Sequence, residues 1–456
     1  MEKTKWLCER IEEKRAEYCR ISNEIWNNPE GGFCEFRSTE ILKNELLKNG
    51  FTVTDGLAGM KTAFQGIFGS GRPVIGIIGE FDALANMSQE GNLTREKPVK
   101  PGGYGHGCGH NLLGTAALAA AVSVKDYLKE NRLEGTVIYF GCPAEETGCG
   151  KSFMTRDGIF KDVDVALTWH PSDANVVVGT SNLASVKVQY DFKGQSSHAA
   201  KNPDKGRSAL DAAELMNTGV QYLREHIVPE ARVHYAFLNA GGTAPNVVQS
   251  EASLLYYVRA SKADQALEIL NRVSDVARGA ALMTSTSVNI KIKSGLLDFV
   301  PNRVLGGVLH DAWSEVGELT YSDEAKEINR RFSEVVGDGI KEKEMSGAVP
   351  DNYRHCPDVH KPVSNDLGDV SYVVPVGKIQ CCCFVKGTLG HSWQLTAQGC
   401  TAIAWDGMMQ AGKVLAVAAV KLIDNPFLVR EANEELVKTT GKEYVCLLPE
   451  GSRPNQ

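Results

Sequence analysis

Three short apolar segments constrain the fold more than any other feature of the sequence. They cover 73–79 (PVIGIIG), 135–141 (GTVIYFG) and 163–169 (VDVALTW). Continuous apolar strands of this kind are buried on both faces, as in a parallel sheet that helices cover on both sides. A helix is expected over 111–128, between the first two strands. The chain therefore predicts an α/β domain built around a parallel-rich mixed sheet.

Helices are also expected at the N-terminus. Apolar residues recur at helical spacing from Trp6 to Trp26 and again from Thr39 to Asn49, where Gly50 ends the second helix. Strand-like residues follow at 51–55. Near the other end, an apolar helix is expected over 402–422.

The pattern changes near residue 184. Segments 184–192 (ASVKVQYDF) and 287–293 (SVNIKIK) alternate polar and apolar residues, as strands with one solvated face do. Between them lie, in order, a helix, two strands and a helix, at 207–225, 234–239, 253–259 and 263–281. This order is the split-βαβ (ferredoxin-like) pattern, a four-stranded antiparallel sheet with two helices on one face. We expect a catalytic domain in two pieces, 1–183 and 296–456, interrupted by an insert at 184–295.

Composition and charge exclude several classes of function. The 49 basic and 56 acidic residues give a net charge of −7 with no basic run, so no nucleic-acid partner is expected. No stretch has 18 consecutive apolar residues, and the first residues lack the apolar core of a secretory signal, so we expect a cytoplasmic protein without a membrane segment. The twelve cysteines are then expected to be reduced.

Candidate metal ligands begin in the glycine-rich segment 105–111 (GHGCGHN). In an extended loop, residues two apart project to the same side, so Cys108 and His110 can converge on one point. Thiolate and imidazole are favoured ligands of zinc-like metals, and glycine lets the backbone fold tightly around an ion. By itself, this short motif is equally compatible with a glycine-rich turn.

Further candidates follow the carboxyl ends of the predicted strands, where ligand sites gather in α/β sheets. Glu145 and Glu146 come after the strand at 135–141; one can ligate a metal while the other acts as a general base, and the alternative is a solvated acidic loop. A histidine also follows the strand at 163–169, and another lies in the loop GTLGHSW. Five potential ligands suit a pair of metals better than one tetrahedral ion: Cys108, His110, Glu146, His170 and His391.

The insert adds three polar candidates. His198 lies in GQSSHAA, Asn246 follows GGTAP, and Arg259 ends the third strand of the insert. Spacing alone favours an ordinary loop histidine, a turn asparagine and a surface arginine.

Taken together and in order, the motifs HGCGHN, PAEETGCGKSFM, TWHP, GQSSHAA and GTLGHSW resemble those of the zinc aminoacylase/carboxypeptidase family. The similarity extends over nearly the whole chain and is greatest to the branch that contains hippurate hydrolases and indole-acetyl-amino-acid hydrolases. It implies a centre of two divalent metals, zinc or manganese with cobalt as a further option. The implied ligands are the five residues named above, and the implied general acid/base is Glu145.

The resemblance also implies roles for the insert. It would be a lid that dimerises, so that His198 reaches the active site of the partner subunit and takes part in catalysis and substrate binding. Asn246 and Arg259 match positions that hold the substrate's free carboxylate. A homodimer is expected, and a heteromer with a related subunit is the alternative.

The implied reaction is hydrolysis of the amide bond of an N-acyl amino acid, with p-aminobenzoyl-glutamate as the expected substrate. Other N-acyl amino acids, dipeptides and a non-catalytic supporting subunit are the alternatives. Asp82, in GEFDAL, is expected to support the metal ligands from behind. Asn111 stands where many relatives carry Asp; if it orients a ligand histidine, this weaker acceptor would tune metal affinity.

Overall fold

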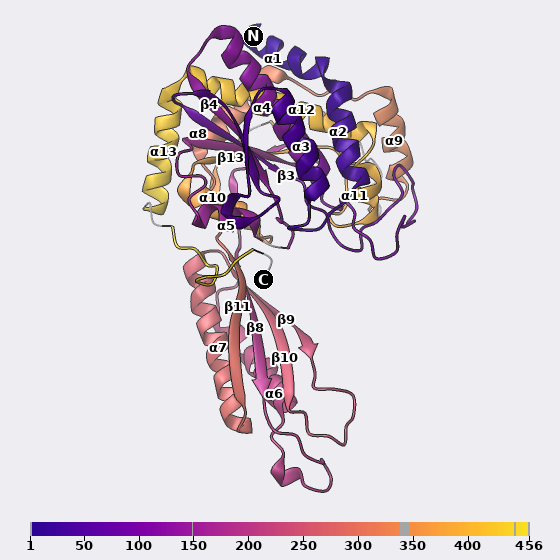
Figure 1. Cartoon of the computed structure of the whole chain (residues 1–456), viewed down its shortest axis with the longest axis vertical. Coiled ribbons are helices and arrows are strands. Elements are labelled where there is room, and N and C mark those ends of the chain that lie inside the picture. Colours follow the sequence, from indigo (N-terminus) through magenta and orange to yellow (C-terminus); the bar gives the residue numbers. More distant parts are fainter. Residues whose placement is uncertain (1, 148, 338–345, 352, 442–443, 455–456) are drawn as a thin grey trace.

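A large α/β body and a smaller projecting unit make up the protein (Figure 1). The computed structural model describes residues 2–147, 149–337, 346–351, 353–441 and 444–454. The body contains a seven-stranded sheet, the projecting unit contains a four-stranded sheet, and a two-stranded sheet pairs β12 with β7.

The elements have the following bounds. The strands are β1 Thr52–Asp55, β2 Phe64–Ser70, β3 Val74–Glu80, β4 Gly135–Cys142, β5 Val165–Ser172, β6 Val176–Val177, β7 Thr180–Asn182, β8 Ala184–Lys193, β9 Arg232–Asn239, β10 Glu251–Ala260, β11 Ser287–Leu296, β12 Cys356–Lys361 and β13 Val376–Cys382. The α-helices are α1 Glu2–Glu13, α2 Arg15–Asn27, α3 Phe36–Lys48, α4 His110–Asn131, α5 Gly150–Arg156, α6 Ala209–Leu223, α7 Ala263–Thr284, α8 Arg303–Val316, α9 Asp323–Ser333, α10 Leu367–Val373, α11 Trp393–Gln398, α12 Ala402–Asp424 and α13 Pro426–Thr440. Short 3-10 helices cover Leu57–Gly59, Pro203–Lys205 and Arg224–His226.

The large sheet has the order β1-β2-β4-β3-β5-β13-β6. Its four central strands, β4, β3, β5 and β13, run parallel to one another, whereas β1, β2 and β6 pair antiparallel at the edges. The carboxyl ends of the four central strands therefore lie along one edge of the sheet. The predicted fold class, a parallel-rich mixed sheet with a split-βαβ insert, is confirmed.

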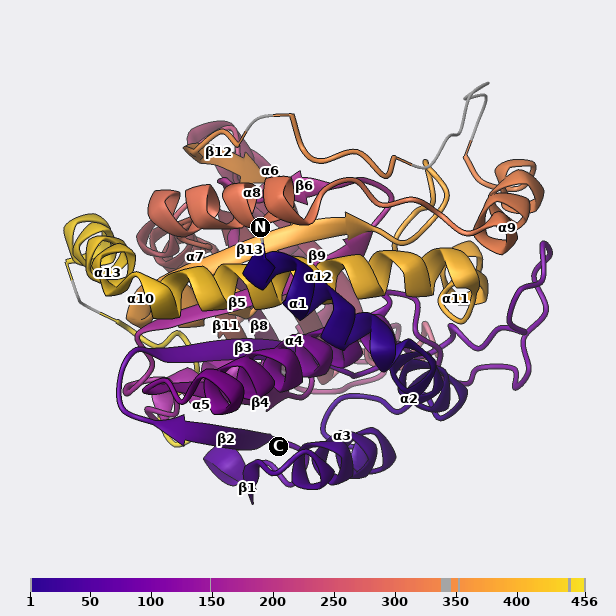
Figure 2. The same ribbon diagram turned by 90° about the horizontal axis from the view of Figure 1, so that it is seen from above.

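Both faces of the central strands are buried, as their continuous apolar sequences predicted. Ile75 and Ile77 of β3 belong to the core that α4 and α12 cover, and these two helices lie side by side against the sheet (Figure 2). Ile78 belongs to a second core on the opposite face, which includes residues of α5 and α10. Successive side chains of a strand point to opposite faces, so one apolar run supplies both cores.

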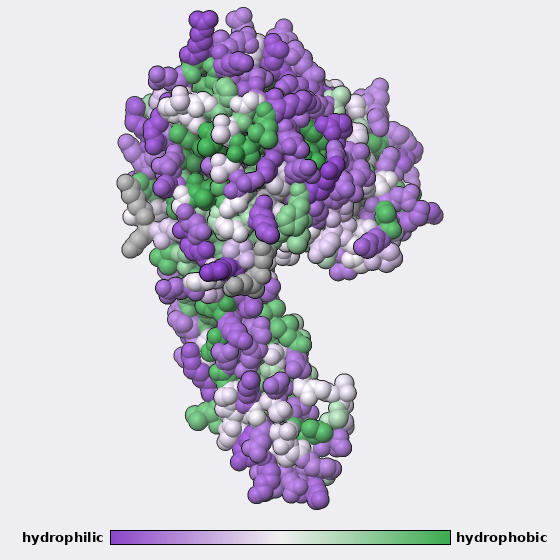
Figure 3. All heavy atoms as spheres, viewed as in Figure 1, coloured by the Kyte–Doolittle hydropathy of each residue, from purple (hydrophilic) through white to green (hydrophobic). Residues whose placement is uncertain are grey.

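The projecting unit follows the predicted order β8-α6-β9-β10-α7-β11, and its sheet has the antiparallel order β11-β8-β10-β9. Val186, Val188 and Tyr190 of β8 are buried, whereas the residues between them are partly exposed. The buried face packs against α6 and α7. The visible surface of this unit intersperses hydrophobic residues among hydrophilic ones (Figure 3).

Local details differ from the sequence-based expectations. The helical pattern from Trp6 to Trp26 forms two helices, because Lys14 leaves helical geometry at φ −102° and ψ 12°. His170 lies inside β5 rather than after it, since β13 continues the pairing and places Gln380 opposite His170. The helix α13 was not predicted. All twelve cysteines are free, as expected.

None of the helices in the described part of the chain combines the length and the apolar character that crossing a bilayer requires.

Candidate metal centre

The predicted ligands meet at the carboxyl edge of the central strands. Glu146 lies in the turn after β4, His170 lies near the end of β5, and His391 follows β13. His110 is the first residue of α4, and the helix can begin there because Gly109 adopts φ +79°. A side chain at Gly109 would also approach Pro171 to 2.8 Å, so both backbone and packing require glycine.

The five side chains form two trios that share one sulfur atom. Cys108, His110 and His170 make the first trio, and Cys108, Glu146 and His391 make the second; within each, the potential ligand atoms lie within 4.8 Å of one another. Cys108 Sγ is 3.3 Å from His170 Nε2, and His391 Nε2 is 3.4 Å from Glu146 Oε2. The structure therefore brings together all five residues that the sequence nominated.

The donor set fits divalent metals. Thiolate, imidazole and carboxylate groups suit zinc and related ions. His110 Nε2 and Glu146 Oε1 are buried and have no hydrogen-bond partner in the described structure, which is costly unless something else satisfies them. The second nitrogens of the two buried histidines are held, with His110 Nδ1 2.8 Å from Asp82 Oδ1 and His170 Nδ1 2.8 Å from the Pro171 carbonyl oxygen. These contacts orient the free nitrogens toward Cys108.

Burial controls the protonation of this cluster. It raises the pKa of the Cys108 thiol to about 12 and lowers the pKa of His170 to about 3. Burial also lowers the pKa of His110, but Cys108 and Asp82 outweigh it and raise that pKa well above the usual value. A cation bound here must therefore displace the thiol proton, which couples metal binding to pH.

Glu145 lies beside both trios without belonging to either. Its carboxylate forms a third close group with Glu80 and His110, and it lines the main cavity. Burial, with the charge of Glu80 as the next contribution, raises the pKa of Glu145 well above its usual value. A carboxyl group that holds a proton at higher pH than usual is suited to proton transfer.

The turn that presents Glu145 is itself constrained. Ala144 has φ +57°, a conformation that non-glycine residues rarely adopt and that surrounding contacts must maintain. Its N–H donates to the buried carboxylate of Glu35 at 2.8 Å. Burial, reinforced by the charge of Asp82, raises the pKa of Glu35 to about 7.

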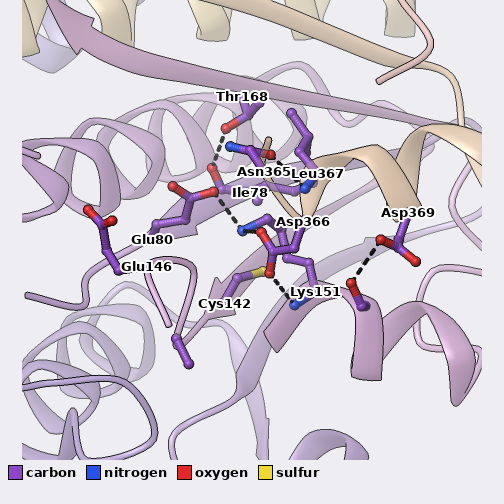
Figure 4. A network of polar contacts seen from close by, with 12 residues as sticks. Ile78, Glu80, Cys142, Glu146, Lys151, Thr168, Asn365, Asp366, Leu367 and Asp369 are labelled. Carbon is purple, nitrogen blue, oxygen red and sulfur yellow. Dashed lines mark hydrogen bonds and ion pairs between the residues drawn. The ribbon is translucent and has the colours of Figure 1, made fainter. Parts of the chain in front are cut away.

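A buried ion network stands behind the centre (Figure 4). Lys151 Nζ lies 2.7 Å from Glu80 Oε1 and 2.5 Å from Asp366 Oδ1, and all three side chains are almost fully buried. The other oxygen of Glu80 faces His110 Nε2 at 3.5 Å. Burial would raise the pKa of Glu80, but the ammonium group of Lys151 lowers it to about 2.

The sequence analysis missed this network and Glu35. Glu80 lies two residues before Asp82, and Lys151 lies within the PAEETGCGKSFM motif, so both were visible beside residues that were singled out. Asp366 had no such signal, because only folding brings it next to Lys151.

Other sequence candidates lie elsewhere. The hydrogen bonds that Asn111 donates go to Ser22 and to the Gly399 carbonyl oxygen, and not to a ligand histidine. His198 and Asn246 lie in the loops after β8 and β9, at the end of the projecting unit that is farther from the body (Figure 1). Neither residue lines the main cavity of its own chain.

The main cavity, of about 690 Å³, lies between the body and the projecting unit. The candidate ligands Cys108, Glu146, His170 and His391 line it together with Glu145. Basic residues of the projecting unit also line it, namely Arg232, His234 and Arg259. Arg259 donates from Nη1 to Ser364 Oγ at 3.0 Å, and its guanidinium lies 5.1 Å from the centre of the Tyr257 ring.

A two-lobed α/β chain with clustered metal ligands beside an unpaired glutamate is a metal-dependent hydrolase of amide bonds. Residues 76–373 match the peptidase family M20/M25/M40, and the chain belongs to that family. It is 40% identical to one of the subunits of p-aminobenzoyl-glutamate hydrolase of Escherichia coli, over 99% of this chain and 98% of that one. It is 28% identical to the Xaa-Arg dipeptidase of Mus musculus over 97% and 92% of the two chains.

Solved structures show the same fold. A putative aminohydrolase from Staphylococcus aureus superposes with a TM-score of 0.68 at 15% identity, covering 92% of this chain and all of the other. A Bacillus subtilis protein described as a dinuclear metal-binding peptidase from the M20 family gives a TM-score of 0.58 at 18% identity, with 90% and 99% covered.

Proposed function

We propose that this protein hydrolyses the amide bond of an N-acyl amino acid with the aid of two divalent metal ions. The observation that carries the proposal is the pair of ligand trios that share Cys108, with Glu145 beside them and outside both. Five ligand side chains from separate loops would be costly to gather in a buried site without cations to neutralise and coordinate them.

The roles of the residues follow from their positions. Cys108, His110 and His170 would hold one ion, and Cys108, Glu146 and His391 the other; zinc, manganese and cobalt are the candidates. Such ions polarise an amide carbonyl and make water acidic. Glu145 takes the proton of the attacking water and delivers it to the leaving nitrogen, so that a carboxylic acid and a free amine are formed. Asp82 keeps His110 in the orientation and tautomer that a ligand needs.

The proposed substrate is p-aminobenzoyl-glutamate, which the Escherichia coli relative is named for. Arg259 would bind the free α-carboxylate of the substrate through its guanidinium. The cavity wall away from the metal ligands carries basic residues, which suits an anionic amino acid and disfavours an arginine dipeptide.

The proposed assembly is a homodimer through the projecting unit. β9 is an edge strand, and its Tyr235, Phe237 and Leu238 are 40–53% exposed, an apolar surface typical of an interface. In this dimer, His198 and Asn246 would complete the cavity of the partner subunit, where His198 would stabilise the developing oxyanion. A heteromer is the alternative, since the Escherichia coli relative is named as one of the subunits of its hydrolase.

Turnover by the purified chain alone tests the reaction. We expect p-aminobenzoyl-glutamate to be cleaved after addition of zinc, manganese or cobalt, and Glu145→Gln to lose nearly all turnover while it binds the metals. Glu130→Gln, an exposed residue of α4, is the matched control. Failure of every metal-loaded preparation to cleave the substrate would favour a supporting subunit. Near-normal activity of Glu145→Gln would remove that residue from the acid/base role.

Mixed dimers test the shared site. His198→Ala and Glu145→Gln should each be inactive alone. When the two variants are denatured and refolded together, we expect about a quarter of the wild-type activity, because half the dimers are mixed and each has one intact site. No recovery in mixed dimers whose formation is verified would place His198 outside the partner's site.

A further inference from the structure

A small side pocket adjoins the main cavity on the sheet side. Its volume is about 70 Å³, and Asn182, Asn365, Lys378 and Gln380 are among the residues that line both spaces. Lys361 lines the side pocket alone. Neither metal binding nor proton transfer uses this pocket, although it opens into the space where the substrate must lie.

The pocket has two cations and no acid. Neither Asp nor Glu is among its described lining residues, whereas both Lys361 and Lys378 are. Among the described residues, no carboxylate lies within ion-pair distance of Lys378. Burial and the charges of Lys151 and Lys361 lower its pKa, against the opposing influence of Glu80 and Glu145. Two ammonium groups that share a partly buried pocket repel each other unless an anion is bound between them.

Neutral groups in the pocket are suited to the same ligand. Asn182 and Asn365 have side-chain amides, and Lys361 Nζ lies 3.5 Å from Gln380 Oε1. Amide N–H groups and ammonium groups are all donors to a carboxylate. The pocket therefore has the chemistry of a carboxylate site, with charge from the lysines and directional donors beside them.

The position of Lys378 connects this pocket to the reaction centre. Lys378 lies on β13 opposite Thr168, and Gln380, on the same face of the strand, lies opposite His170. Arg259 lines a different part of the cavity, on β10 of the projecting unit, where it contacts Ser364. One cavity thus contains two separate basic sites, one on each wall.

We propose that Lys378, assisted by Lys361, binds the side-chain carboxylate of the substrate's amino acid, so that the enzyme selects N-acyl derivatives of dicarboxylic amino acids. Arg259 binds the α-carboxylate, and Lys378 recognises the second one. This assignment rests on the proposed function for the reaction, but the binding preference itself needs no turnover.

A matched pair of substrates tests the proposal. p-Aminobenzoyl-glutamate and p-aminobenzoyl-glutamine have the same shape and differ in the charge of the side-chain terminus. We expect the wild type to have a higher kcat/KM for the glutamate compound, and Lys378→Met to reduce that preference roughly 10- to 100-fold, the size of a lost hydrogen bond to a charged group. Lys361→Met should reduce it less, because Lys361 is exposed. Lys129→Met, an exposed residue of α4, should leave the ratio unchanged.

Binding of the product amino acids separates this proposal from the reaction. Calorimetric titration of the metal-loaded protein with L-glutamate and L-glutamine should show tighter binding of glutamate to the wild type and nearly equal binding to Lys378→Met. A wild type that binds both alike, or a Lys378→Met variant that is folded by circular dichroism and keeps the preference, overturns the proposal. If no substrate is cleaved but the binding preference depends on Lys378, the reaction is wrong and the carboxylate site stands.

Discussion

Replacing Lys151 with methionine should destabilise the body of the protein by about 3–5 kcal/mol, the usual result of removing one partner from a buried ion pair. Methionine has a similar length, so the substitution leaves no large cavity. It does leave Glu80 and Asp366 buried without their cation. Because those two carboxylates also repel each other, the upper part of this range is expected.

The destabilisation should depend on pH with a definite sign. In the wild type, the pKa of Glu80 is lowered to about 2 in the folded state, so its contribution is present at neutral pH and is lost as the pH falls below the unfolded value. Without Lys151, the folded-state pKa of Glu80 rises above that unfolded value. Protonation then relieves the buried charge, and the difference between variant and wild type should shrink as the pH falls toward 5.

Tryptophan fluorescence during urea unfolding measures this difference. The six tryptophans are Trp6, Trp26, Trp169, Trp313, Trp393 and Trp405, so all lie outside residues 184–295 and report on the body alone. A chelator should be present, so that metal binding does not contribute to stability. Lys3→Met is the matched control, because its 2.8 Å pair with Asp424 is 63% and 31% exposed and should contribute less than about 1 kcal/mol.

Two results would refute this reasoning. If Lys151→Met and Lys3→Met lose the same small free energy of unfolding, the buried network does not stabilise the body. If the loss is large but equal at pH 5 and pH 8, it comes from packing and not from uncompensated charge.

Three further predictions concern the site. Asp82→Asn should weaken metal binding roughly 10- to 100-fold, as measured by chelator competition, because His110 loses the carboxylate that orients it; unchanged affinity would contradict this. Burial raises the folded-state pKa of Glu35 to about 7, so the folded state binds more protons than the unfolded state between pH 4.5 and pH 7, and stability should fall by about 3 kcal/mol across that window. Glu35→Gln should remove that slope in urea unfolding at pH 5 and pH 8, and a slope that persists would exclude Glu35 as its source. Arg259→Lys should lower kcat/KM for p-aminobenzoyl-glutamate roughly tenfold or more, because lysine cannot make a bidentate contact; kinetics equal to the wild type would place the α-carboxylate elsewhere.

Much of the fold could be predicted from local patterns. Continuous apolar runs indicated strands buried on both faces, and alternation indicated the half-exposed sheet of the projecting unit, because side-chain direction follows backbone period. The break at Lys14 and the continuation of β5 past His170 could not be predicted this way. The first is a departure from helical backbone geometry at one residue, and the second depends on pairing with β13, a strand more than 200 residues later.

The sequence by itself determined which residues are suited to bind metal, because thiol, imidazole and carboxylate chemistry belongs to the residues and their motifs. Only the tertiary structure decided their grouping, in which Cys108 is common to two trios and Glu145 lies beside them. It alone also placed Lys151 between Glu80 and Asp366, and Lys378 in a pocket with Lys361. The physical reason is that burial and the distance between charges decide what an ionisable group does, and both arise when distant segments pack together.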